Sequence, residues 1–399
     1  MTLVVDDVRL AHAPDRRVSV VCDDGLIVAI EPAGTVPDAA ADVERVDGHG
    51  ALALPGLVDA HAHVDKTLYS GPWVPNPGVG TVAERIAHER RERERFGLPS
   101  EQYVSALVER MIANGTTRIR THTDVDPGVG LRGIETVARV AERYRDLVTI
   151  EQVAFPQGGL ISNPGTLELL ERAVALGVPT IGGIDPAIVD RAPTVQLDAL
   201  FDLAARTGCG IDIHLHEDGS LGAWEFEEIA VRTIAYDMAG RVVISHAFGI
   251  AHPPTQQRLI ERLAEAGVAL ATAAVYDVPM PPLLALDAAG VTLACGSDGI
   301  RDLWGPFGNG DMLQRAMHVA YRNSVRTDRG LELALRAATS GGAQVLGVQH
   351  YGLDVGCVAD LVLVDARNAA EAVASVPPRR VVVSRGRVVA VDGALVVDV

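Results

Sequence analysis

Short apolar runs alternate with segments of helical spacing through the middle of the chain. Eight apolar runs of strand length occur, at 52–63, 117–125, 147–155, 179–185, 210–216, 242–247, 268–274 and 291–297. Apolar residues three and four positions apart predict helices between them, at 101–113, 134–144, 167–176, 195–207, 255–266 and 311–322. The alternation favours a parallel sheet, and the number eight favours a closed (β/α)8 barrel. The alternative, an open doubly wound sheet, lacks the glycine-rich phosphate loop expected after its first strand.

The two ends of the chain have a different pattern. Short strands bounded by turn residues are predicted at 2–5, 18–22, 26–30, 361–364, 380–383 and 388–391. Two β-rich ends around a different middle predict one small β-sandwich domain built from both termini, since chain ends commonly lie close together. We therefore expect an α/β protein with sandwich segments at 1–55 and 348–399 and the barrel at 56–347.

Composition narrows the class of protein. The 399 residues are 48% hydrophobic, enough for a large buried core, and the formal charge of −17 disfavours nucleic-acid binding. The four cysteines are widely separated, which is typical of a reducing cytoplasm. The N-terminus has no signal-peptide pattern, and no apolar run reaches the roughly 18 residues of a membrane span. A cytoplasmic protein is predicted.

Charged residues are unevenly used along the chain. Lys66 is the one lysine among 35 basic residues. The stretch 85–95 (RIAHERRERER) is rich in arginine and glutamate. Because its charges of both signs are interspersed, we expect a solvated helix face there rather than an anion-binding or partner site.

The strongest chemical signal is the pair His61 and His63 at the end of the first predicted barrel strand. Residues two apart on a strand share one face, and in a barrel that face points inward. Active sites of such barrels lie at the carboxyl ends of the strands. Two imidazoles there suit a divalent transition metal, and two hydrogen-bonded core histidines are the structural alternative.

Other predicted strands end in residues of the same kind. His214 lies at the end of the fifth strand, His246 ends the sixth, and Asp298 follows the eighth. Taken singly, His246 is equally explained as a hydrogen-bonded core histidine and Asp298 as a helix cap. Because all these strand ends meet at one rim of a barrel, the residues together predict a metal site.

With these motifs the sequence resembles the amidohydrolase superfamily, and within it the cytosine deaminase-like branch. The superfamily pattern is HAH at 61–63, one histidine each on strands five and six, and an aspartate after strand eight. The branch pattern lies in RTHTD at 120–124, VAFPQGG at 153–159, HLHE at 214–217 and DGIRDLWGPFGNGDMLQ at 298–314. The resemblance covers nearly the whole chain and also implies a barrel with a β-sandwich made from both termini.

The resemblance implies that His61, His63, His214 and Asp298 hold one divalent metal ion, Zn²⁺ or Fe²⁺, together with a water molecule. Binuclear relatives bridge two metals with a carboxylated lysine, occasionally a glutamate, on strand four. The predicted fourth strand contains neither, and Lys66 lies just beyond strand one. A mononuclear site is therefore expected.

In the mechanism that the resemblance implies, the metal lowers the pKa of its water and so creates the nucleophile. Asp298 takes a proton from this water and passes it toward the leaving amine. Glu217, three residues after a ligand, protonates a ring nitrogen of the substrate. His246 orients the nucleophile and stabilises the developing oxyanion. His122 and Asp124 are expected either to orient the ligands or to make structural hydrogen bonds.

The resemblance also implies substrate-binding residues. The amide of Gln157 both donates and accepts hydrogen bonds and so matches a –CO–NH– edge of a ring, with a turn glutamine as the alternative. Trp304 offers a flat face for a planar heterocycle, with plain loop packing as the alternative. Lys66 either neutralises an anionic substrate or pairs with Asp65, and the sequence leaves both open.

At a few positions the sequence departs from bacterial cytosine deaminases. Gly299 follows Asp298 where a second aspartate is usual, which we expect to remove a charged acceptor and leave room. His216 precedes Glu217 where an acidic residue is usual, and we expect an ordinary rim histidine. Asp185, at the end of strand four, is a further candidate pocket acid.

The sequence thus predicts a metal-dependent hydrolase that deaminates an aminated N-heterocycle, such as a cytosine-like pyrimidine or a triazine, and releases ammonia. The alternative is a related C–N hydrolase that opens a cyclic amide or releases an alkylamine, as N-isopropylammelide hydrolases of this branch do. A non-catalytic member is disfavoured because every expected ligand and acid–base residue is present. The expected partner is a small-molecule substrate, with neither nucleic acid nor membrane, and the resemblance suggests a homo-oligomer.

Overall fold

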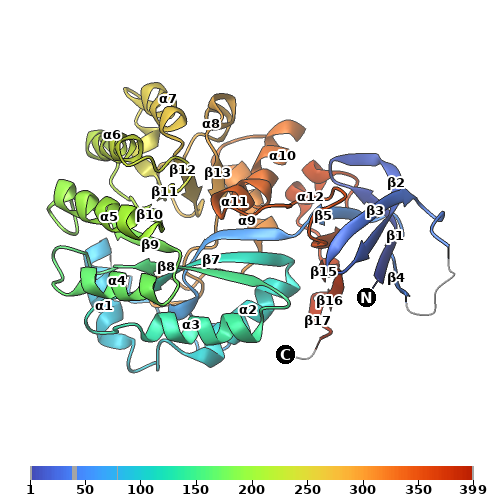
Figure 1. Cartoon of the computed structure of the whole chain (residues 1–399), viewed down its shortest axis with the longest axis horizontal. Helices are drawn as coiled ribbons and strands as arrows, with labels where there is room; N and C mark the ends of the chain where they lie inside the picture. The colour runs from blue at the N-terminus through green and yellow to red at the C-terminus, as the bar shows by residue number, and fades with distance from the viewer. Residues whose placement is uncertain (1, 38–42, 79, 398–399) are drawn as a thin grey trace.

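The computed structural model describes residues 2–37, 43–78 and 80–397, as a barrel with a smaller β-domain beside it (Figure 1). Eight parallel strands pair in chain order around the barrel. They are β6 (Leu57–Ala62), β7 (Thr116–Asp124), β8 (Thr149–Phe155), β9 (Thr180–Ile184), β10 (Gly210–His214), β11 (Val242–Ser245), β12 (Ala269–Thr272) and β13 (Leu293–Cys295). The predicted barrel is confirmed.

The first and last strands meet at the carboxyl end of the barrel. The backbone N–H of Asp298 donates to the carbonyl of His61 at 2.8 Å, and that of Ser297 donates to Asp59 Oδ1 at 3.0 Å. A Cβ at Gly296 would lie 2.2 Å from the His61 carbonyl oxygen, so only glycine permits this approach. The barrel therefore closes through the backbone of two residues that the sequence singled out as metal ligands.

Helices surround the barrel (Figure 1). They are α1 (Val82–Glu92), α2 (Glu101–Ala113), α3 (Arg132–Arg143), α4 (Thr166–Ala175), α5 (Pro193–Thr207), α6 (Gly219–Ala235), α7 (Gln256–Ala266), α8 (Leu283–Ala289), α9 (Met312–Arg322), α10 (Asp328–Ala337) and α11 (Ser340–Val345). Short 3₁₀ turns, η1 (Val64–Lys66) and η2 (Phe248–Ala251), follow β6 and β11. The helix predicted at 101–113 coincides with α2, whose N-cap Ser100 accepts the N–H of Tyr103 at 3.4 Å.

The smaller β-domain is one sheet formed from both ends of the chain. Its strands are β1 (Thr2–Leu10), β2 (Ala13–Asp23), β3 (Leu26–Pro32), β4 (Val43–Asp47), β5 (Leu52–Pro55), β14 (Leu361–Val364), β15 (Arg379–Ser384), β16 (Arg387–Val391) and β17 (Ala394–Leu395). β5 joins the two ends, because it pairs with β1 on one side and β14 on the other. The predicted β-domain from both termini is confirmed.

The connection between the two units is short. The predicted run 52–63 is split into β5 and β6 at Gly56, where a Cβ would lie 2.4 Å from Thr117 Oγ1. On the C-terminal side, α12 (Ala369–Ser375) packs Ala372 and Val373 into the barrel's hydrophobic core. The division at 55/56 and 347/348 stays a prediction. No helix among the described residues is long and apolar enough to cross a lipid bilayer.

Candidate active site

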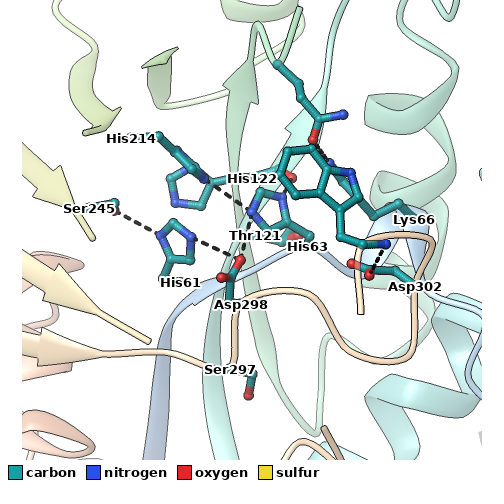
Figure 2. Close-up of polar contacts among 12 residues, drawn as sticks. His61, His63, Lys66, Thr121, His122, His214, Ser245, Ser297, Asp298 and Asp302 are labelled. Atoms are coloured by element: carbon teal, nitrogen blue, oxygen red, sulfur yellow. Dashed lines mark hydrogen bonds and ion pairs between the residues drawn. The ribbon is translucent and has the colours of Figure 1, made fainter. Parts of the chain in front are cut away.

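Four side chains meet at the carboxyl end of the barrel strands (Figure 2). His61 lies on β6, His63 directly follows it, His214 ends β10 and Asp298 follows β13. His63 Nε2 lies 3.2 Å from His214 Nε2 and 3.3 Å from Asp298 Oδ1, and His61 Nε2 lies 3.7 Å from that same oxygen. The structure thus brings together the four residues that the sequence suggested as ligands.

This cluster fits a divalent metal ion. Metal–ligand bonds of about 2.0–2.1 Å in a tetrahedron put ligand atoms about 3.4 Å apart, close to the separations observed. Burial lowers the pKa of His214 well below its usual value, and burial with Lys66 nearby lowers the pKa of His63 to about 4, so both rings are neutral. Despite burial, His61 and His63 hold the pKa of the Asp298 carboxyl well below its usual range. Neutral imidazoles and an ionised carboxylate are a suitable donor set.

His246 stands beside this cluster at the end of β11. Its Nε2 is buried without a hydrogen bond from the described residues, and its ring belongs with His61 and Asp298 to a group whose ligand atoms lie within 4.8 Å. The backbone of His246 has φ 65° and that of Asp298 has φ 60°, in the left-handed region. Such conformations concentrate at functional sites, because they aim a side chain at the expense of backbone strain.

Hydrogen bonds hold the His61 ring from behind. His61 Nδ1 lies 2.9 Å from Ser245 Oγ (Figure 2). Ser245 Oγ in turn donates to Asp212 Oδ1 at 2.6 Å. Asp212 also pairs with Arg120 at 3.4 Å. Partners of this kind fix the orientation and tautomer of a ligand histidine. Sequence reasoning missed Asp212, although it lies two positions before His214 and therefore shares its strand face.

His122 and Asp124, both on β7, contact different parts of the site. The carbonyl of His122 lies 3.0 Å from His63 Nδ1, so its backbone orients a proposed ligand. The His122 ring is fully buried 3.6 Å from Asp212, and its nitrogens make no hydrogen bond within the described chain. Asp124 turns away and binds Lys66.

Lys66 is buried among acidic and amide groups. Its Nζ donates to Asp124 at 2.7 Å and to Gln157 Oε1, and lies 3.8 Å from Glu89. Although burial opposes it, Asp124 and Glu89 raise the pKa of Lys66. Asp65, one of the alternatives expected as its partner, accepts the backbone N–H of Asp124 at 2.9 Å instead. Gln157 Nε2 donates to Glu89 at 3.0 Å, so the protein engages both ends of this amide, and its contact with substrate stays a prediction.

Glu89 corrects the expectation of a wholly solvated face for the stretch 85–95. The residue is 2% exposed, and its carboxylate accepts hydrogen bonds from Gln157 and from the indole N–H of Trp304. On the same stretch Arg93 is buried and pairs with Asp126 at 3.1 Å. A charge pattern shows that a helix is polar, but it does not show which of its charges find buried partners, so sequence reasoning missed Glu89.

His216 is clamped at the cavity wall rather than free on the rim. Its Nδ1 lies 2.9 Å from Asp185 Oδ2, and its backbone N–H donates to Asp185 Oδ1 at 2.7 Å. Against the effect of burial, Asp185 raises the pKa of the His216 ring. Asp185 itself is buried just after β9, where its backbone has φ 34°. Its carboxylate holds the imidazole of His216 in place.

Glu217 lies beside that pair, close to Asp185. Its Oε1 accepts the backbone N–H groups of Ile188 at 3.0 Å and Ala187 at 3.2 Å. Glu217 is 2% exposed, and it is not one of the described residues that line the cavity above the histidine cluster. Burial, with Asp185 and Glu225 nearby, raises the pKa of Glu217 to about 9. Its proton-donating role stays a prediction.

Replacing Glu225 by glutamine is expected to stabilise the fold at alkaline pH. Burial and Asp185 raise the pKa of Glu225 from 4.5 to about 8, so the folded state holds a proton that the unfolded chain has released. Stability therefore falls as the pH rises from about 4.5 to 8 in the wild type, and a neutral amide removes this loss. Scanning calorimetry should show the variant melting on the order of 2 °C higher at pH 9, and level with the wild type at pH 5.

The matched control for this prediction is Glu228→Gln on the same helix, where the carboxylate is half-buried and pairs with Arg232 at 2.7 Å. It is expected to gain no stability at pH 9. An equal gain for Glu225→Gln at both pH values would show that repacking, and not the proton, is responsible.

A cavity of about 1130 Å³ opens over the histidine cluster. His63, His214, His246 and Asp298 lie in its wall, together with His216 and Trp304. Apolar side chains, among them Phe155, Ile184, Phe248 and Phe307, line part of this wall, and charged ones such as Arg85 and Arg315 line another part. A volume of this size is at the upper end of small-molecule sites, which run to about 1,000 Å³.

Gly299 does not open free space, which corrects the expectation from sequence. A Cβ at this position would lie 2.0 Å from Asp302 Oδ2, so a carboxylate already fills the place. Asp302 lies in the cavity wall three residues beyond the glycine. The loop thus supplies a charged acceptor after all, from a residue that sequence reasoning did not single out.

Known proteins resemble this chain over most of its length. A family model described as the amidohydrolase family matches residues 97–397. N-isopropylammelide isopropyl amidohydrolase of Pseudomonas sp. (strain ADP) is 33% identical over 370 residues, 91% of this chain and 90% of that protein. The crystal structure of N-isopropylammelide isopropylaminohydrolase from Burkholderia multivorans ATCC 17616 matches with a TM-score of 0.94 at 44% identity, covering 99% of this chain and 100% of that one. A 5-methylcytosine deaminase from Klebsiella pneumoniae, liganded with 5-fluorocytosine, matches with a TM-score of 0.84 at 25% identity, covering 98% and 97%.

Proposed function

Because this chain belongs to the amidohydrolase family and is a hydrolase of carbon–nitrogen bonds other than peptide bonds, we propose that it removes an amine from an aminated N-heterocycle. The observation that carries the proposal is one cavity whose wall holds both the clamped His216 ring and three of the four clustered residues, His63, His214 and Asp298. In the reaction a C–O bond forms at the ring carbon and the exocyclic C–N bond breaks. One proton of the attacking water leaves with the amine, and the other stays on the ring product.

The donor set supports one Zn²⁺ or Fe²⁺ ion held by His61, His63, His214 and Asp298. Such an ion, when bound, lowers the pKa of a water molecule toward neutrality and so supplies the nucleophile. Asp298 is ionised and accepts a proton from the attacking water. The Ser245 and Asp212 hydrogen bonds keep His61 in the tautomer that a ligand needs.

Two further histidines act on the substrate side. The unpartnered His246 Nε2 donates a hydrogen bond to the oxygen that attacks the ring, where negative charge develops. His216, oriented by Asp185, donates a proton to the leaving amine, since its ring lines the cavity. This assignment differs from the expectation from sequence, in which Asp298 passes a proton to the amine and Glu217 protonates a ring nitrogen. We assign proton donation to His216 because the Glu217 carboxyl lies against backbone amides. Trp304 offers its ring face to the heterocycle.

Alkylamine release is the version that we favour over ammonia release. The cavity is large, and apolar side chains such as Phe155, Ile184 and Phe248 can cover an alkyl group. The similar proteins from Pseudomonas and Burkholderia are named for N-isopropylammelide, at 33% and 44% identity. Ammonia release is the second candidate, favoured by the likeness to a 5-methylcytosine deaminase.

The test is amine release by the full chain loaded with Zn²⁺ or Fe²⁺. The panel holds N-isopropylammelide, ammelide, cytosine and 5-methylcytosine, and chromatography separates isopropylamine from ammonia. We expect isopropylamine from the alkylated triazine to appear fastest. Faster ammonia release from an unsubstituted ring would establish a deaminase instead. No amine from any of the four rings would contradict the proposed function.

A further inference from the structure

The loop between β13 and α9 places a carboxylate in the cavity wall that the mechanism above does not use. Asp302 is 8% exposed and lines the cavity. Its Oδ1 accepts the backbone N–H groups of Trp304 at 2.8 Å and Gly305 at 2.9 Å. In Figure 2 Asp302 is seen to the right of Asp298, near Lys66. The carboxylate is therefore held in one orientation by its own turn.

The second oxygen of Asp302 lies against Gly299. A Cβ at Gly299 would come within 2.0 Å of Oδ2, so any larger residue there would push the carboxylate away. The hydrogen bonds that the described residues give this carboxylate end on Oδ1. Oδ2 thus keeps its capacity to accept a hydrogen bond, and an acceptor in a cavity wall that the described residues leave without a partner favours a ligand that donates to it.

The Asp302 carboxylate has no hydrogen bond from Lys66, the cation that acts on it. Lys66 is the cation that favours its ionised form, but the Lys66 ammonium group donates to Asp124 and Gln157. Burial raises the pKa of the Asp302 carboxyl to about 7, and Glu89 adds to this effect. At pH 8 the carboxylate is ionised and can only accept.

We propose that Asp302 is a specificity-determining residue that accepts a hydrogen bond from a ring N–H of the heterocycle, and that Gly299 is the glycine that lets it reach this place. The class of ligand rests on the proposed function. A lactam N–H next to a ring carbonyl can donate a hydrogen bond to Oδ2. A ring nitrogen that carries a lone pair or a methyl group has no proton and cannot bond to the carboxylate. The site therefore selects oxo-substituted rings that carry N–H groups.

The test is equilibrium binding to the metal-loaded full chain at pH 8, measured by calorimetry. One probe is uracil, a neutral ring with two lactam N–H groups, and the other is 1,3-dimethyluracil, in which methyl groups replace both. We expect the wild type to prefer uracil about 10- to 100-fold, the effect of a hydrogen bond to a charged group. Asp302→Asn and Gly299→Ala should each lose most of this preference, because one removes the carboxylate charge and the other displaces the carboxylate.

Two control variants match these changes. Gly80→Ala adds a methyl group to another glycine of the cavity wall, where the nearest atom, Glu84 Oε2, would be 3.6 Å away. Asp277→Asn removes a carboxylate from an exposed position next to Tyr276, a residue of the cavity wall. Both should keep the wild-type preference for uracil.

The outcomes separate this inference from the proposed function, because binding needs no turnover. If neither variant changes the preference, or if the wild type binds both rings equally, the assignment of Asp302 is overturned, even if amine release is found. If the preference is lost in Asp302→Asn and kept in the controls, the assignment stands, even if no amine is released. Should Asp302→Asn fail to fold, Gly299→Ala decides alone by the same criterion.

Discussion

Replacing His63 by alanine is expected to reduce turnover to background and to lower the metal content of the purified chain below one ion. His63 Nε2 lies within 3.3 Å of both His214 Nε2 and Asp298 Oδ1, so its loss opens the centre of the donor set. Removing groups that merely orient a ligand costs about 10- to 100-fold in affinity or activity, and loss of a ligand should cost more. Elemental analysis and amine release on the same preparation check both expectations.

The control for this variant is His318→Ala. His318 lines the same cavity but belongs to none of the ligand groups found among the described residues. It should keep its metal and most of its turnover. A His63→Ala protein that retains a full metal complement would contradict the ligand set, and a chelator-treated wild type that stays active would contradict metal dependence altogether.

Changing His216 to glutamine is expected to lower kcat by about 10²- to 10⁴-fold, the usual contribution of a positioned proton donor. The glutamine amide keeps much of the ring's volume but cannot deliver a proton to the amine. KM and the metal content should change little, since His216 is outside the proposed ligand set. Steady-state kinetics with elemental analysis separate these effects.

Two further variants test whether His216 or Glu217 donates the proton. Asp185→Asn weakens the clamp on His216 and should cause a smaller fall in kcat, about 10- to 100-fold. Glu217→Gln should leave kcat nearly unchanged, because its carboxyl binds the amides of Ile188 and Ala187. If Glu217→Gln is the inactive variant and His216→Gln the active one, the proton donor is Glu217, as the sequence alone suggested.

The parts of the site that lie on regular strands were predictable from the sequence. A strand puts residues two apart on one face, so the spacing of His61 and His63 sets their direction, and the barrel brings His214 to the same rim. The β-domain was predictable for a similar reason, because alternating short strands with turn residues recur at both ends.

Where the backbone is irregular its conformation was not predictable, although His246 and Asp298 were themselves named from the sequence. Asp302 reaches Gly299 through a turn, and no periodic pattern specifies that turn. His246 and Asp185 have positive φ values, which residue type does not reveal. Glu89 is buried because one face of α1 meets Gln157 and other residues of the cavity wall, a tertiary contact that a pattern of charges cannot show.

Closure of the barrel also determines when a functional centre can exist. The backbone N–H of Asp298 bonds to His61, so the first and eighth strands meet where the metal would bind, although more than half of the chain separates them in sequence. Contacts this distant form late in folding, and a chain still on the ribosome without β13 has its histidine pair but not its carboxylate. Products of premature termination would therefore be inactive rather than partly active.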